Sequence, residues 1–140
     1  MEITANALQS VATGSNVVFT NTAVAGNCSM MHREGSGLIT LRGLTNGQRR
    51  ARFRVSFGAN IGLPSTGTAG AISLAIAING EPVATSTMIS TPAATEQFNS
   101  ISRALFLDVL GGCCTQISIE NTSSQTIDVE NASLIIERVA

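Results

Sequence analysis

Few side chains in this sequence are equipped for covalent chemistry. The chain has 140 residues but only one histidine, His32, and three cysteines, Cys28, Cys113 and Cys114. A hydrolytic triad needs a base beside its nucleophile, and no serine stands in a G-x-S-x-G motif. The glycine-rich residues 62–70 lack the lysine and the following helix of a phosphate-binding loop. The sequence therefore predicts a protein that is not an enzyme and uses no cofactor, with His32 as a surface or interface side chain.

The three cysteines do not fit a disulfide framework, which uses an even number. Cys113 and Cys114 are adjacent and would bridge each other only in strained geometry, and no CxxC pair or histidine completes a zinc site. We expect Cys28, Cys113 and Cys114 to be buried free thiols, and a redox or metal role is the alternative. Asp128 and Glu130 share a strand face where a weak Ca²⁺ site is conceivable, but solvation or pairing with arginine is favoured.

A stripe of arginines is the strongest polar feature. Arg50, Arg52 and Arg54 alternate with apolar residues in RRARFRVSF, which spaces their side chains about 7 Å apart on one face of a strand. This face either meets solvent or forms charge-assisted hydrogen bonds across an interface, to Glu137, Asp108 or a partner's carboxylates. Arg103, in an otherwise apolar strand, favours the interface, because a buried charge there needs a partner.

Composition limits the class of partner. Charged residues make up 12% of the chain, the formal net charge is −1, and Trp and Tyr are absent. Such a balance gives no electrostatic drive toward nucleic acids or acidic membranes. An acid at Glu2 and no following apolar run argue against an export signal, and the most apolar window is about half the length that spans a bilayer. We therefore expect a soluble protein that binds neither nucleic acid nor membrane.

Period-2 patterns separated by turns predict an all-β protein, an antiparallel β-sandwich or jelly roll of about eight to ten short strands. Arg49 to Phe57 alternates most clearly, and strict i+2 spacing in Ala71 to Asn79 favours a strand over a helix. The remaining predicted strands cover residues 16–20, 28–32, 38–42, 83–90 and three segments between 98 and 140. Thr45-Asn46-Gly47 is predicted as a hairpin turn and residues 58–70 as a loop.

Two of the predicted strands are apolar on both faces. One contains Leu105 and Leu107, and the other contains Ile135. A single sandwich core covers one face of a strand, so the second face needs another cover, most simply a second copy of the chain. We therefore predict an oligomer interface that includes these three residues with Arg50, Arg52, Arg54, Arg103 and Glu137.

The N-terminal fifteen residues are weakly patterned. Leu8 and Val11 are their main apolar anchors. We expect residues 1–15 to be an arm that orders against a partner, with Leu8 and Val11 as contacts to a particle, and residues 16–140 to form a single jelly-roll domain. Residues 58–70 are a second candidate contact.

The order of elements resembles the tumour necrosis factor-like jelly roll, especially its small trimeric versions on bacteriophage virions and on collagen-like bacterial surface proteins. Four segments carry the resemblance: GLITLRG, RRARFRVSF, AISLAIAINGEPVATS and ISIENTSSQTIDVENASLIIERVA. The resemblance implies a homotrimer whose last strand lies near the threefold axis. The tyrosines usual at that axis are missing, so axial packing would use aliphatic residues and some of Phe53, Phe57, Phe98 and Phe106.

The function expected from this reasoning is structural. We expect a non-enzymatic virion protein, a trimeric capsid decoration or head-fibre protein that binds the particle surface after assembly in the host cytoplasm. The alternative is a receptor- or glycan-binding tip domain of a phage fibre or bacterial surface protein. Sugar-binding sites usually employ exposed aromatic platforms, and the absence of Trp and Tyr favours the structural function.

Overall fold

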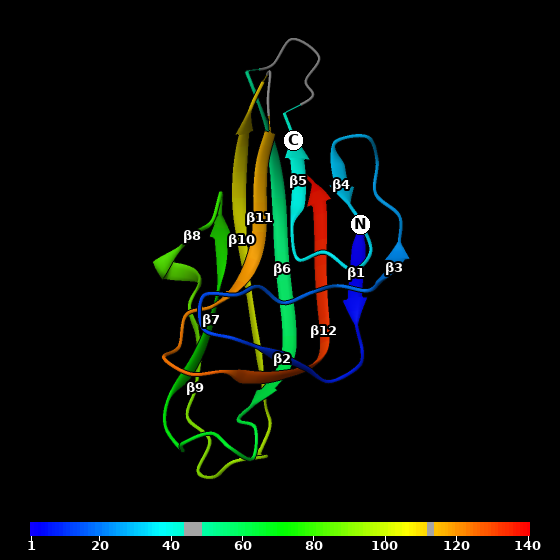
Figure 1. Cartoon of the computed structure of the whole chain (residues 1–140). Coiled ribbons are helices and arrows are strands. Elements are labelled where there is room, and N and C mark those ends of the chain that lie inside the picture. The colour runs from blue at the N-terminus through cyan, green and yellow to red at the C-terminus, as the bar shows by residue number, and fades with distance from the viewer. Residues whose placement is uncertain (44–48, 112–113) are drawn as a thin grey trace.

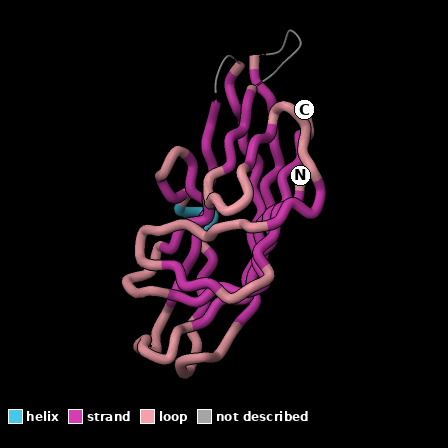
Figure 2. The backbone as a smooth tube through the Cα atoms, turned by 45° about the vertical axis from the view of Figure 1, so that its right-hand side comes forward, coloured by secondary structure: helices cyan, strands magenta, loops and turns pink. Residues whose placement is uncertain are grey.

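The protein is a sandwich of two antiparallel sheets whose long strands run along the length of the molecule (Figure 1). The computed structural model describes residues 1–43, 49–111 and 114–140. Sheet A has the strand order β10-β6-β12-β1-β3, with β2 also paired to β12, and sheet B has the order β4-β5-β11-β7-β8, with β9 also paired to β7. Strands and loops account for nearly all of the described chain (Figure 2).

The strands of sheet A differ greatly in length. They are β1 (Glu2–Ala5), β2 (Gln9–Val11), β3 (Asn21–Val24), β6 (Arg50–Gly62), β10 (Asn99–Leu110) and β12 (Ile127–Arg138). Those of sheet B are β4 (Met30–His32), β5 (Ile39–Arg42), β7 (Ile72–Ile78), β8 (Glu81–Pro82), β9 (Met88–Ser90) and β11 (Cys114–Asn121), and a 3₁₀ turn, η1, covers Ala84–Ser86. The predicted all-β antiparallel sandwich is confirmed.

Strand β6 divides the core from the surface, as its alternation predicts. Phe53, Val55 and Phe57 are buried between the sheets, whereas Arg52 and Arg54 are exposed on the opposite face. Phe57 meets the buried Phe19 edge-to-face, with ring centroids 6.3 Å apart and planes at 82°. This is a favourable geometry for two aromatic quadrupoles, and it ties β6 to the segment before β3.

Three predicted elements differ from the structure. Residues 16–20 form only isolated bridges, because this segment crosses from sheet B, where Asn16 pairs with Glu120, to the start of β3 in sheet A. Strand β6 continues to Gly62, since Ala59 and Ile61 extend its buried face beyond Phe57. Residues 83–90 contain η1 and the short β9 instead of one strand. The predicted turn at 45–47 lies outside the described residues.

The N-terminal segment is part of the sandwich, so its description as an arm is wrong. Strand β1 pairs with β12 and β3, and β2 pairs with β12. Val11 is 2% exposed and belongs to the core, which excludes it as a particle contact, whereas Leu8 is 53% exposed. Because these strands are short and pair only with residues distant in sequence, their local pattern was weak.

A buried asparagine secures the turn before β12. Asn121 is 1% exposed, and its Nδ2 donates to the carbonyl oxygens of Val11 at 2.9 Å and Gln125 at 3.0 Å. Its Oδ1 accepts hydrogen bonds from both the backbone N–H and the hydroxyl of Ser123. A buried amide is tolerated only with such partners, so this network holds the turn against β2.

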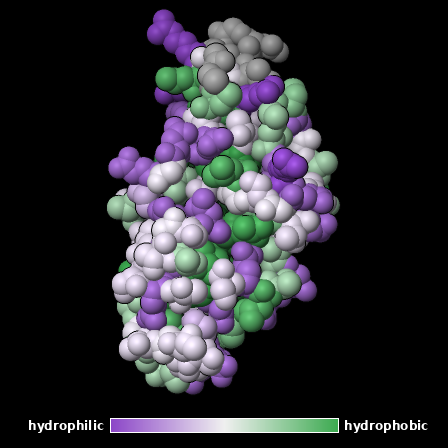
Figure 3. All heavy atoms as spheres, viewed as in Figure 1, coloured by the Kyte–Doolittle hydropathy of each residue, from purple (hydrophilic) through white to green (hydrophobic). Residues whose placement is uncertain are grey.

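Within the described ranges, no helix is long and apolar enough to cross a membrane. On the side shown in Figure 3, apolar residues occur in small separate groups among polar ones.

Replacing Phe57 by alanine should destabilise the sandwich strongly. Phe57 is 1% exposed, so Phe57→Ala loses its transfer free energy and leaves a cavity, at a cost of about 3–5 kcal/mol. Leu8→Ala is the control, because exposed Leu8 should change the free energy of unfolding by less than about 0.5 kcal/mol. Urea denaturation followed by circular dichroism at one protein concentration measures both. Equal costs for the two variants would show that the core is not organised around β6.

Candidate functional site

The outer face of sheet A is the surface turned away from the core by β6, β10 and β12. It follows from the alternation of these strands, since every second residue of β6 lies on it. Its charged and apolar half contains Arg50, Arg52, Arg54, Ala104, Phe106, Asp108, Leu110, Ile135, Glu137 and Val139.

A bidentate ion pair lies at the centre of this half. Asp108 is directly opposite Arg52 in the register of β10 and β6. The Nε of Arg52 donates to Oδ1 of Asp108 at 2.8 Å and its Nη2 donates to Oδ2 at 3.1 Å, while Nη1 of Arg50 lies 3.4 Å from Oδ2. Such a fork fixes both side chains more firmly than a single contact does.

This pairing shifts the ionisation of both groups. The hydrogen bond from Arg52, helped by the charges of Arg52 and Arg50, lowers the pKa of Asp108 below its ordinary value of 3.8. The same hydrogen bond and the charge of Asp108 raise the pKa of Arg52. Both groups are therefore charged throughout the neutral range.

A second ion pair crosses from β6 to β12. Arg54 lies opposite Glu137, and its Nη1 is 3.4 Å from Oε1 of Glu137. Asp108 and Glu137, which the sequence indicated as partners of the arginines, are thus confirmed as partners, within one chain. Whether the stripe also takes part in an interface between copies stays a prediction.

Exposed apolar side chains fill the spaces between the ion pairs. Phe106 is 66% exposed and lies opposite Arg54, and Leu110 is 71% exposed and lies opposite Arg50. Ile135 and Val139 add 42% and 45% exposed side chains from the end of the chain. A hollow of about 380 Å³ lies among Arg52, Phe106, Asp108, Val139 and Ala140. Ile135 is among the residues predicted for an oligomer interface, whereas Leu110 and Val139 were not singled out from the sequence.

The other half of the outer face is polar and carries a chain of amide hydrogen bonds. The hydroxyl of Ser100 donates to Oδ1 of Asn60 at 2.7 Å, and Nδ2 of Asn60 donates to Oδ1 of Asn131 at 3.0 Å. Nδ2 of Asn131 then donates to Oδ1 of Asn6 at 2.7 Å. The sequence does not predict this ladder of amide hydrogen bonds, because Asn131, with φ of 54°, lies in a bulge of β12 that breaks the inward–outward alternation of the strand.

Leu105 and Leu107 do not lie on this face, and their part in an oligomer interface stays a prediction. They stand opposite the buried Val55 and Phe53 and pack half-buried against the core. The outward residues of the same run are Ala104 and Phe106, because an apolar run alone does not reveal which of its residues point inward.

Arg103 lies at the open edge of the sandwich. It follows the core-facing parity of β10, yet it is exposed, and its Nη2 donates to the carbonyl oxygen of Thr87 at 3.4 Å. A hollow of about 310 Å³ runs beside it between the edge strands β9 and β10, lined in part by Ile89, which is 67% exposed. This β9–β10 edge is a second partly apolar surface, distinct from the outer face.

The histidine and the cysteines, whose side chains are the most reactive in the sequence, do not form a common site among the described residues. The Nε2 of His32 lies 2.9 Å from the carbonyl oxygen of Ser36, and its ring meets Phe19 edge-to-face. Cys28 and Cys114 are exposed, so their predicted burial is wrong, and Cys113 lies outside the described residues. Among the described residues no three His, Cys, Asp or Glu side chains gather as metal ligands.

Neutralising Asp108 should remove one acid-dependent part of the stability. Because the pKa of Asp108 is lower in the folded protein than in the unfolded chain, its contribution is present above pH 3.8 and is lost as the pH falls through the folded value. Wild type should therefore be more stable than Asp108→Asn near neutral pH, and their melting temperatures should converge in acid. Asp128→Asn is the matched control. An Asp108→Asn difference that does not narrow in acid would contradict the pairing.

Comparison with known proteins identifies the fold. No protein-family model and no curated protein matches the sequence. The globular domain of zebrafish complement 1qA protein superposes with a TM-score of 0.64 over 96% of this chain and 93% of that chain, at 14% identity. A family 35 carbohydrate-binding module from Clostridium thermocellum gives a TM-score of 0.37 at 15% identity over 96% of this chain and 91% of that chain, which supports no argument. The chain is therefore an antiparallel jelly roll of the tumour necrosis factor-like type.

Proposed function

We propose that this chain is a non-enzymatic structural protein that acts as a homotrimer. We further propose that this trimer is a capsid decoration or head-fibre protein of a bacteriophage. It would be assembled in the host cytoplasm and then reach the surface of the virion.

The proposal of a homotrimer depends on one observation, the exposed charged and apolar half of the outer face of sheet A. Phe106, Ile135 and Val139 are each more than two-fifths exposed on this face, and Phe106 and Val139 line one hollow with Arg52 and Asp108. Apolar groups gathered in this way on a folded domain mark an interaction surface. Aromatic residues and arginines are also enriched at the centres of protein interfaces, whereas lysine is depleted there.

A ring of three copies requires two different surfaces on each copy, because a threefold contact is heterologous. The outer face of sheet A supplies one of them, and the β9–β10 edge supplies the other. The edge presents Ile89 and Arg103, which complement the apolar Ile135 and the acidic Glu137 of the outer face. Docking the edge on the outer face would also cover the unpaired backbone groups of β10, which is an exposed edge strand.

The virion part of the proposal rests on the four segments that resemble small trimeric jelly rolls of phage particles. It is supported by the scarcity of reactive groups, which suits a structural protein. The exposed Leu8 is the remaining contact candidate from that segment.

Placing a charge in the outer face should separate the copies. Phe106→Glu puts a carboxylate beside Asp108 at the proposed contact, and we expect the mass from light scattering to fall from three times 14.4 kDa to 14.4 kDa. Leu8→Glu is the matched control, because it changes another exposed apolar residue, in the turn between β1 and β2, and should leave the trimer intact.

Two results would contradict the homotrimer or its proposed interface. A wild-type chain that elutes and scatters as a monomer at micromolar concentration would refute the homotrimer. A Phe106→Glu protein that stays trimeric would move the interface away from the outer face. Circular dichroism confirms that the variant is folded before its mass is interpreted.

Immunogold microscopy tests the virion part separately. Antibodies raised against the purified chain should label phage particles recovered from a culture that expresses the gene, and labelling should be lost from particles made without it. Labelling confined to bacterial surfaces would favour the alternative of a surface or receptor-binding protein.

A further inference from the structure

Three arginines lie toward one end of the sandwich. Arg42 is the last residue of β5 in sheet B, and Arg49 directly precedes β6 in sheet A. Arg50 begins β6 and lies opposite the exposed Leu110. We call Arg42, Arg49, Arg50 and Leu110 the arginine end.

A glycine contact between the sheets brings these residues together. Gly43, which follows Arg42 at the end of β5, forms a parallel bridge with Gly111, which follows Leu110 at the end of β10. The N–H of Gly111 donates to the carbonyl oxygen of Arg49 at 2.8 Å. A Cβ on Gly43 would lie 2.1 Å from the carbonyl oxygen of Leu110, so only glycine permits this approach. The backbone therefore holds the arginines of two sheets at one end.

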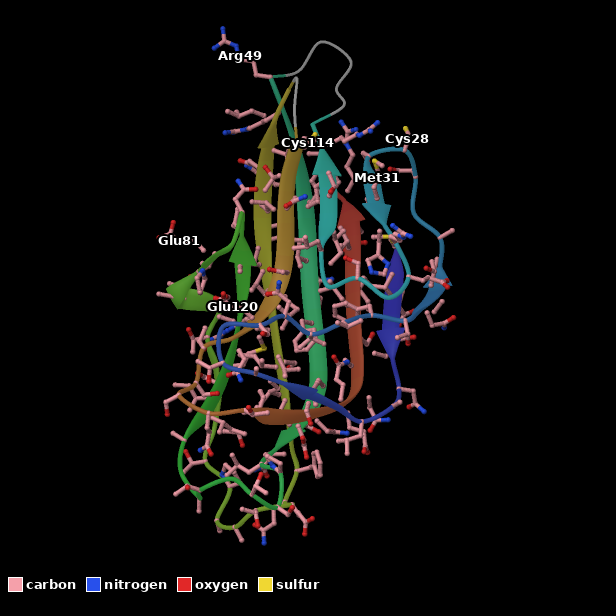
Figure 4. All side chains as sticks on the ribbon, in the orientation of Figure 1. Cys28, Met31, Arg49, Glu81, Cys114 and Glu120 are labelled. Carbon is pink, nitrogen blue, oxygen red and sulfur yellow. The ribbon has the colours of Figure 1, made fainter. Side chains whose placement is uncertain are left out.

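Two of these arginines are not neutralised. Arg50 shares Asp108 with Arg52, at 3.4 Å from its carboxylate. Within residues 1–43, 49–111 and 114–140, the ion pairs use Arg50, Arg52 and Arg54, and neither Arg42 nor Arg49 has a carboxylate partner. Figure 4 shows Arg49 extending away from the sheets at this end.

This arrangement is unexpected for a chain with a net charge of −1. Each guanidinium group is able to bind a carboxylate through two parallel hydrogen bonds. Leu110, 71% exposed beside them, adds an apolar contact. Positive charge next to exposed apolar surface is complementary to an acidic segment that also carries an apolar side chain.

We infer that the arginine end is a docking surface for an acidic segment of a partner protein, whose carboxylates bind Arg42 and Arg49 and whose apolar side chain packs on Leu110. A protein is favoured over a nucleic acid, because nucleic-acid affinity grows with the number of phosphates neutralised and the arginine end has few free charges. This surface goes beyond the proposed trimer: Arg42 and Arg49 are not among the residues of the outer face, and the arginine end adjoins that face at Arg50 and Leu110.

A labelled peptide tests the docking surface on the full chain. Fluorescence anisotropy would follow a short fluorescein-labelled peptide of glutamates and leucines, with glutamines replacing the glutamates in the control peptide. We expect saturable binding of the acidic peptide only, and weaker binding as NaCl rises from about 50 mM to about 500 mM. Arg42→Gln with Arg49→Gln should raise the dissociation constant about tenfold or more.

Arg33→Gln is the matched control for charge. Arg33 is exposed and follows β4, whose register with β5 places it at the opposite end of β5 from Arg42. This variant should bind the acidic peptide as wild type does. Arg42→Lys with Arg49→Lys keeps the charge and should retain part of the affinity, which separates loss of charge from misfolding.

Three results would overturn the inference: equal binding of the glutamine peptide, unchanged affinity in the double glutamine variant, or tighter binding of oligothymidylate than of the acidic peptide. Light scattering of the same variants keeps this test distinct from the homotrimer, since the glutamine variant should keep the wild-type mass. A monomeric wild type that binds the acidic peptide would refute the trimer alone.

Discussion

Strand β6 must satisfy two different environments along its whole length. Its phenylalanines and valine require the space between the sheets, and its arginines require water or carboxylates. A slip of the register by one residue would bury Arg52 and Arg54 and expose Phe53, which the hydrophobic effect and charge desolvation both oppose. The register of β10 and β12 follows from this constraint, and that register brings Asp108 and Glu137 opposite their arginines.

The ion pairs of the outer face contribute more to order than to stability. Exposed pairs add little to the free energy of unfolding, because water screens them and long side chains lose rotamer freedom. The bidentate Arg52–Asp108 contact nevertheless holds a long side chain in one position next to Phe106. A surface whose side chains are already ordered loses less entropy when it associates, and this favours binding without new contacts.

The sequence alone predicts the parts of this structure whose signal is local. The alternation of β6 and the strand at β7 follow from residue spacing. The orientation of the run around Phe106 does not, because both faces of that run are apolar and the register with β6 decides which residues point inward. The short strands β1 and β2 and the amide ladder at Asn131 depend on contacts between distant segments and on a bulge, which no local pattern reports.

The central position of β12 affects how the chain is made. Strand β12 lies between β6 and β1 and also pairs with β2, so β1, β2 and β6 each lack one neighbouring strand until residues 127–138 are synthesised. Contacts between such distant segments slow folding, since long loops must close before any of them form. Nascent copies would therefore stay open during synthesis, with the arginine face and the core face of β6 both accessible to chaperones, and would close in one late step.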